Sequence, residues 1–173
     1  MEAIPVDGYL GIDVGSVSTN VVVIDRQGEV LSSVYLRTHG QPIRAVKEGL
    51  AKAKEEVGTK VNIIAAGTTG SGRLLAGVMI GADVVKNEIT SHAVAASRAV
   101  PGVQTILEIG GQDSKIIIMR HGIVTDFAMN TVCAAGTGSF LDQQAARLGI
   151  PIEDFGALAL KSRNPVRIAG RCT

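Results

Sequence analysis

The chain has 173 residues, of which 46% are hydrophobic and 19% charged, a balance typical of a globular protein with one good core, or with one domain and part of another. A net charge of +1, a 3% aromatic content and the lack of tryptophan give no argument for nucleic acid or an anionic membrane as partner. No apolar run approaches the ~18 residues of a membrane span. The first residues do not resemble a secretory signal, and there are only two cysteines, so we expect a cytoplasmic protein in a reducing compartment.

The first hundred residues alternate between strand and helix patterns. Apolar and β-branched runs predict strands at residues 9–14, 19–25, 29–36 and 62–66. Periodic apolar residues predict helices from Pro42 onward and at about residues 73–80 and 88–100. The apolar face of the first helix is expected to comprise Ile43, Val46, Leu50, Ala53 and Val57. Residues 67–72 are expected to form a loop, so this part should be a three-strand meander followed by strand–helix units.

The next part repeats the order of the first. Strand patterns cover residues 105–109, 114–119 and 123–129. Residues 12–15 match residues 107–110 at an offset of 95, so that Asp13 corresponds to Glu108. We interpret this as a duplicated domain, with the first copy at residues 1–102 and the second at 103–173. The strands that would complete the second copy are missing, which predicts a truncated second domain.

The turns that follow the two acids suggest a phosphate site. Backbone N–H groups of two Gly-rich hairpin turns, together with nearby hydroxyls, bind anions well. Asp13 and Glu108 could hold Mg²⁺ through waters, and Gln112 or Asp113 could position an attacking water. One such turn alone says little, because Gly-Ser turns join strands in many proteins, but the duplication strengthens the interpretation. The chain has no Walker A motif, and the glycines of residues 67–72 are not a dinucleotide fingerprint.

A further motif begins at Cys133, where a small, Gly-rich turn leads into a predicted helix. The apolar positions of this helix are Phe140, Leu141, Ala145 and Leu148. Cys133 would therefore lie just ahead of a helix N-terminus, a place that favours a thiolate and a bound anion such as a negatively charged metal cluster. A small buried cysteine that packs against the helix start explains the same pattern.

Four stretches together resemble a known family. Residues 10–16 and 107–115 are similar to the phosphate-1 and phosphate-2 loops of the acetate and sugar kinase/Hsp70/actin superfamily. Residues 130–140 and 167–173 resemble motifs of the activators of 2-hydroxyacyl-CoA dehydratases, in the BadF/BadG/BcrA/BcrD ATPase family. The resemblance covers essentially the whole chain. It implies an α/β, ribonuclease H-like fold of the actin/Hsp70 type, duplicated, with the second copy truncated.

The resemblance also implies a function, namely an ATP-dependent iron–sulfur reductase that drives a low-potential electron onto a partner CoA-ester dehydratase or reductase. A donor such as ferredoxin or flavodoxin would supply the electron. A homodimer would share one [4Fe–4S] cluster, with Cys133 and Cys172 as its ligands in each subunit, which agrees with two thiolates per chain and about four per cubane.

Mg·ATP would be served by Asp13, Glu108 and Gln112 as catalytic residues, although Glu108 stands where the superfamily usually has Asp. The residues expected to contact the nucleotide are Gly15, Ser16, Ser18, Thr19, Gly110, Gly111, Gln112, Asp113, Lys115, Gly136 and Gly138. The superfamily's adenosine-binding Gly-Gly loop would lie beyond Thr173. We therefore expect the 173 residues alone to bind ATP weakly and to hydrolyse it negligibly.

Two other functions stay open at this stage. A small-molecule kinase of the same fold, of the amino-sugar type, would need a catalytic Asp beside the substrate hydroxyl and would have no use for the two cysteines. A non-catalytic scaffold domain is the other alternative, and in it the two Gly-rich turns would only join strands and bind no phosphate.

Overall fold

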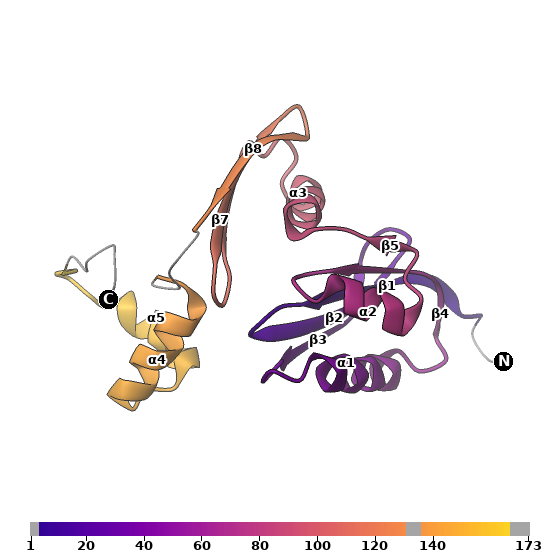
Figure 1. Ribbon diagram of the computed structural model, residues 1–173, viewed down its shortest axis with the longest axis horizontal. Coiled ribbons are helices and arrows are strands. Elements are labelled where there is room, and N and C mark those ends of the chain that lie inside the picture. Colours follow the sequence, from indigo (N-terminus) through magenta and orange to yellow (C-terminus); the bar gives the residue numbers. More distant parts are fainter. Residues whose placement is uncertain (1–3, 131–135, 167–173) are drawn as a thin grey trace. The chain divides into compact units, whose positions relative to one another are not determined.

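The computed structural model describes residues 4–130 and 136–166, and the chain divides into two compact units, Met1–Ala99 and Val100–Thr173 (Figure 1). No helix in these described ranges is both long enough and apolar enough to pass through a bilayer.

The first unit is built on a five-stranded sheet with the order β3-β2-β1-β4-β5. The strands are β1 (Val6–Val14), β2 (Ser18–Asp25), β3 (Val30–Arg37), β4 (Val61–Thr69) and β5 (Val84–Val85). The first three strands form an antiparallel meander, whereas β4 runs parallel to β1 after the chain has crossed over through α1 (Pro42–Val57). The predicted meander is thus confirmed, and the strand order is that of a ribonuclease H-like sheet.

The core of this unit lies on one face of the sheet. Side chains of a strand alternate between the two faces, and in β1 and β2 the buried set is Ile12, Val14, Val21 and Val23. The helices α1 and α2 (Arg73–Ile80) cover this set with Val46, Ala53, Val57 and Ala76. Asp13 and Asn20 consequently fall on the opposite face of the sheet.

Two expectations for this unit need correction, and one strand was missed. Ile43 is 49% exposed and is not part of the buried face of α1, where Ala45 and Gly49 are found instead. The fourth strand continues through Thr69 rather than ending before residue 67, because Thr68 and Thr69 pair with Ile12 and Asp13 of β1. The two-residue β5 was not predicted, since such a short segment carries no periodicity.

The second unit repeats the meander. Its strands β6 (Thr105–Ile109), β7 (Ser114–Arg120) and β8 (Ile123–Met129) are antiparallel in the order β6-β7-β8. The turn between β7 and β8 has positive φ at both His121 (52°) and Gly122 (77°), as a tight two-residue hairpin turn requires. Within the described residues this unit has no counterpart of β4 and β5, in agreement with the predicted shorter second copy.

Three helices complete the described part of the chain. The helix α3 (Glu88–Ala99) was predicted, and α4 (Gly138–Leu148) matches the predicted helix after the cysteine motif. The apolar face expected for α4 is only partly buried, because Ala145 is buried while Leu141 and Leu148 are 41% and 64% exposed. A helix not predicted, α5 (Ile152–Ala159), contacts α4 after a turn at Gly149, which has a left-handed conformation.

Thr38, at the end of β3, supports the turn between β1 and β2. Its hydroxyl donates to the carbonyl oxygen of Gly15 (3.0 Å) and lies 3.0 Å from the hydroxyl of Thr19. Its backbone N–H donates to the carbonyl oxygen of Val17 (2.8 Å). Thr19 is completely buried and Thr38 is 4% exposed, so these bonds are formed away from water and fix the shape of the turn.

We expect Thr38→Val to lower the free energy of unfolding by about 1–3 kcal/mol, because the nearly isosteric side chain leaves the buried Thr19 hydroxyl and Gly15 carbonyl without their partner. Thr38→Ser, which retains the hydroxyl, should be the milder change. Thr59→Val, at an exposed position, serves as the control. Urea unfolding measures all three variants, and equal stability of Thr38→Val and wild type would show that the buried bonds do not hold the turn.

Candidate functional site

The first turn, residues 15–18, lies between β1 and β2 and is closed by a hydrogen bond from the Gly15 N–H to the Ser18 carbonyl oxygen (2.8 Å). Ser16 is exposed on this turn, where its hydroxyl is accessible to an anion. Thr19 was also predicted to contact the nucleotide, but its side chain is fully buried against Thr38. Thr19 therefore supports the turn from behind.

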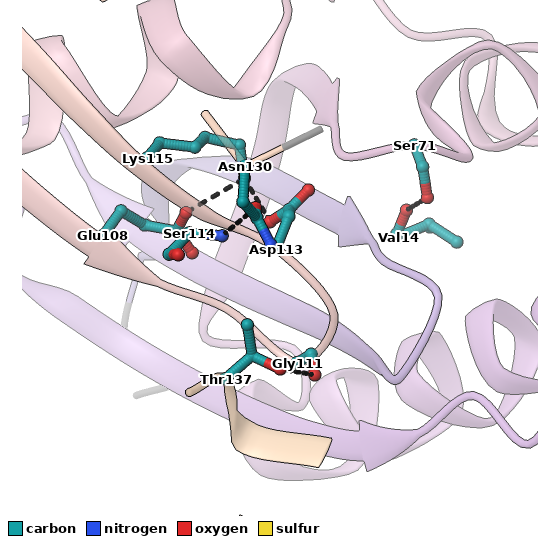
Figure 2. Close-up of polar contacts among 9 residues, drawn as sticks. All are labelled: Val14, Ser71, Glu108, Gly111, Asp113, Ser114, Lys115, Asn130 and Thr137. Carbon is teal, nitrogen blue, oxygen red and sulfur yellow. Dashed lines mark hydrogen bonds and ion pairs between the residues drawn. The ribbon is translucent and has the colours of Figure 1, made fainter. Parts of the chain in front are cut away.

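Residues 70–72 pack directly against this turn. The Gly72 N–H donates to the Val14 carbonyl oxygen (2.8 Å), and the Ser71 hydroxyl donates to the same oxygen (3.3 Å; Figure 2). Gly70 has a φ of +88°, and a side chain there would collide with the Asp13 carboxylate and the Val14 carbonyl. Sequence reasoning treated this segment only as a loop, although two glycines directly after a strand were the available signal.

Asp13 lines a cavity of about 300 Å³ on the face of the sheet opposite to α1 and α2. The Asn20 amide donates to the Asp13 carboxylate at 3.4 Å from the neighbouring strand. Lys86 and the hydroxyls of Thr69 and Ser91, which are 3.1 Å apart, also line the cavity. The arrangement offers a carboxylate, an ammonium group and hydroxyls beside a mainly apolar hollow, a combination that suits a polar ligand with an apolar part.

The second turn, residues 110–113, reproduces the first. The Gly110 N–H donates to the Asp113 carbonyl oxygen (2.8 Å), just as Gly15 donates to Ser18. Gln112, which was predicted to position a water, is exposed on the turn. A Cβ atom at Gly110 would lie 3.0 Å from Glu108 Oε1 and 3.1 Å from Asp113 Oδ1, so glycine leaves room for both carboxylates here.

Both carboxylates meet Lys115, which lies on β7. Lys115 Nζ is 2.9 Å from Glu108 Oε2 and 2.6 Å from Asp113 Oδ1, and its side chain is only 4% exposed (Figure 2). Asn130 holds the start of the same strand, because its side-chain oxygen accepts the Ser114 N–H (2.8 Å). Lys115 was predicted to contact the nucleotide, and the structure places it in two ion pairs.

The start of α4 is attached to the second turn. The N–H groups of Gly138 and Ser139 donate to the carbonyl oxygens of Gly110 (2.9 Å) and Gly111 (2.8 Å), and the Thr137 hydroxyl donates to Gly111 as well (3.0 Å; Figure 2). Thr137 is completely buried. A Cβ atom at Gly138 would lie 3.3 Å from the Gly110 carbonyl oxygen, so this glycine permits the close approach.

Sequence reasoning missed the role of Thr137. A threonine immediately before a helix is usually interpreted as an N-cap, but Thr137 makes no side-chain capping bond to α4. The N–H groups of Gly138 and Ser139, at the helix start that was expected to favour an anion, already have carbonyl partners.

The predicted site residues are thus divided between the units. Asp13, Gly15, Ser16, Ser18 and Thr19 lie in the first unit, and Glu108, Gly110, Gly111, Gln112, Asp113, Lys115, Gly136 and Gly138 lie in the second. Cys133 and Cys172 lie outside the described residues. Among the residues that are described, no three His, Cys, Asp or Glu side chains gather as possible ligands of a metal ion.

Known proteins share this architecture. The chain is 38% identical over 172 residues to the (R)-2-hydroxyglutaryl-CoA dehydratase activating ATPase of Acidaminococcus fermentans, a match that covers 95% of this chain and 62% of that protein. The solved structure of the activator of the 2-hydroxyisocaproyl-CoA dehydratase from Clostridium difficile with bound ADPNP gives a TM-score of 0.82 at 29% identity, covering 95% of this chain and 61% of that one. A ROK family glucokinase from Streptomyces griseus, in complex with glucose and AMPPNP, has a TM-score of 0.57 at 17% identity over 88% of this chain and 65% of its own, and shares only the fold.

These similarities confirm the predicted fold class. The chain spans about three fifths of the length of the activators that it matches. The sequence profile of one family matches residues 10–173, and together with the 38% identity this match shows that the chain belongs to the BadF/BadG/BcrA/BcrD ATPase family.

Proposed function

We propose that the whole protein is an ATPase that uses Mg·ATP to drive a low-potential electron onto a partner dehydratase or reductase that acts on CoA esters. The observation that carries this proposal is the pair of equivalent turns, each closed by the same backbone hydrogen bond and each preceded by an acid. Membership of an ATPase family and the activator names of the relatives support the same function.

The residues of the turns suit a triphosphate and its metal. Gly15 and Gly110 bring backbone close to an anion without a side chain in the way, and the Ser16 hydroxyl is exposed to it. Asp13 is half-buried, a setting in which a carboxylate binds Mg²⁺ directly or through water. Exposed Gln112 would orient the water that attacks the γ-phosphate.

The second turn provides a route from the nucleotide to the cysteine motif. Three hydrogen bonds from Thr137, Gly138 and Ser139 attach α4 to Gly110 and Gly111, so that a displacement of this turn moves the start of α4 with it. Cys133 lies four residues before Thr137 in the sequence. We therefore propose that the nucleotide state alters the position of the cluster ligands through α4.

We further propose that Cys133 and Cys172 from each of two subunits hold one [4Fe–4S] cluster, because two cysteines per chain supply the four thiolates of a cubane only in a dimer. When bound, the cluster would supply a single low-potential electron, received from a donor such as ferredoxin or flavodoxin. The kinase alternative has weaker support, since the glucokinase shares only the fold while a relative at 38% identity is named as an activating ATPase.

Asp13→Asn should weaken the binding of Mg·ADPNP to the whole protein at least about tenfold, because a charged metal ligand becomes neutral. The affinity for ADPNP without Mg²⁺ should change little. Asp7→Asn, at the other end of β1, is the matched control, since it removes an exposed ion pair with Arg26 and affects a hydrogen bond from Asn62, both of them outside the turn. Calorimetric titration separates these cases, and equal losses with and without Mg²⁺ would contradict a role of Asp13 toward the metal.

Cys133→Ser and Cys172→Ser, each made in the whole protein and purified without oxygen, should contain almost no iron, because each subunit then gives one thiolate instead of two. Iron analysis and the visible absorption of the cluster provide the measurement, with wild type prepared in parallel. Retention of a full cluster in either variant would exclude that cysteine as a ligand.

A further inference from the structure

The two turns differ in charge at one equivalent position. Asp13 is paired across the strands with Asn20, and Glu108 is paired across the strands with Lys115. Both acids precede the first glycine of their turn by two residues, so the two pairs occupy the same place in the two copies. The second turn therefore has an ammonium group where the first has a neutral amide.

The ammonium group of Lys115 lies between two carboxylates, in the position that a bound metal cation would take. Its nitrogen lies 2.9 Å from Glu108 Oε2 and 2.6 Å from Asp113 Oδ1, so that two carboxylates from different positions converge on it. Gly110, which has no side chain, leaves the room that both carboxylates need. The Lys115 side chain is 4% exposed, so loss of its carboxylate partners would leave a buried positive charge uncompensated, which is costly.

The two turns carry the same net charge, which also supports a role of Lys115 as a cation. Glu108, Asp113 and Lys115 together carry one net negative charge, and the Asp13–Asn20 pair carries the same. Without Lys115, the second turn would have two adjacent carboxylates, which would repel a triphosphate and attract a divalent cation.

We propose that Lys115 is a built-in counter-ion that occupies the cation position of the second turn, so that Glu108 and Asp113 do not ligate Mg²⁺ and the metal is held from the first turn by Asp13. Lys115 is then a positioning residue for Glu108 and Asp113 and not a phosphate ligand. The assignment of the metal to Asp13 rests on the proposed function, whereas the role of Lys115 as counter-ion concerns the chain by itself.

The test replaces Lys115 with asparagine, the residue that the first turn has at the equivalent position, Asn20. In the 173-residue chain without nucleotide, Lys115→Asn should gain one Mn²⁺ site that wild type lacks, with an affinity at least about tenfold above any binding of Mn²⁺ by wild type. Titration followed by the electron paramagnetic resonance of free Mn²⁺ measures this, and Mn²⁺ stands in for Mg²⁺. Lys115→Arg, which retains the cation, should gain no site. Addition of Glu108→Gln to Lys115→Asn should abolish the gained site.

A folded Lys115→Asn variant without the extra site would overturn the proposal, as would a wild-type Mn²⁺ site that Glu108→Gln removes. Circular dichroism establishes whether the variant is folded. If it is not, Glu108→Gln in the whole protein decides the question: Mn²⁺ binding in the presence of ADPNP should stay within about twofold of wild type, and a loss as large as that of Asp13→Asn would refute the counter-ion role. A failure of the protein to bind ADPNP would reject the proposed function and leave the nucleotide-free result valid.

Discussion

One backbone hydrogen bond, made twice, fixes the two turns on which the proposed nucleotide site is built. Gly15 donates to Ser18 and Gly110 donates to Asp113, and each bond closes a hairpin immediately after a strand whose penultimate residue is an acid. Because side chains alternate along these strands, Asp13 and Glu108 each share a face with the residue directly opposite on the next strand. The same backbone thus presents two similar sites that differ in their side chains.

The two turns have different surroundings, which supports different roles for them in the proposed ATPase. The first turn is hydrogen-bonded to buried Thr38, which also contacts buried Thr19, and residues 70–72 bond to the end of β1 beside it, while Asp13 lines a cavity. The second turn gives its carbonyl oxygens to the start of α4. In the proposed ATPase, the first turn would hold the metal and the second would transmit the state of the nucleotide to α4.

The repeated meanders and most helices could be predicted from sequence, because periodicity and turn glycines are local signals. The partners of particular side chains could not. Burial of Thr19 against Thr38 depends on how β2 pairs with β3, and the contact of Gly70 with Asp13 depends on a parallel crossover. Lys115 was predicted to contact the nucleotide from its motif alone, whereas its ion pair with Glu108 follows from the register of β6 and β7.

The most direct test is a crystal structure of the whole protein with Mg·ADPNP. We predict that the β- and γ-phosphates contact the backbone of residues 15–18 and 110–113, that Mg²⁺ lies beside Asp13, and that Lys115 stays paired with Glu108 and Asp113. A metal ion bound by Glu108 and Asp113, with Lys115 displaced, would contradict the assignment of different tasks to the two turns. Phosphates bound away from both turns would contradict the account of the nucleotide site.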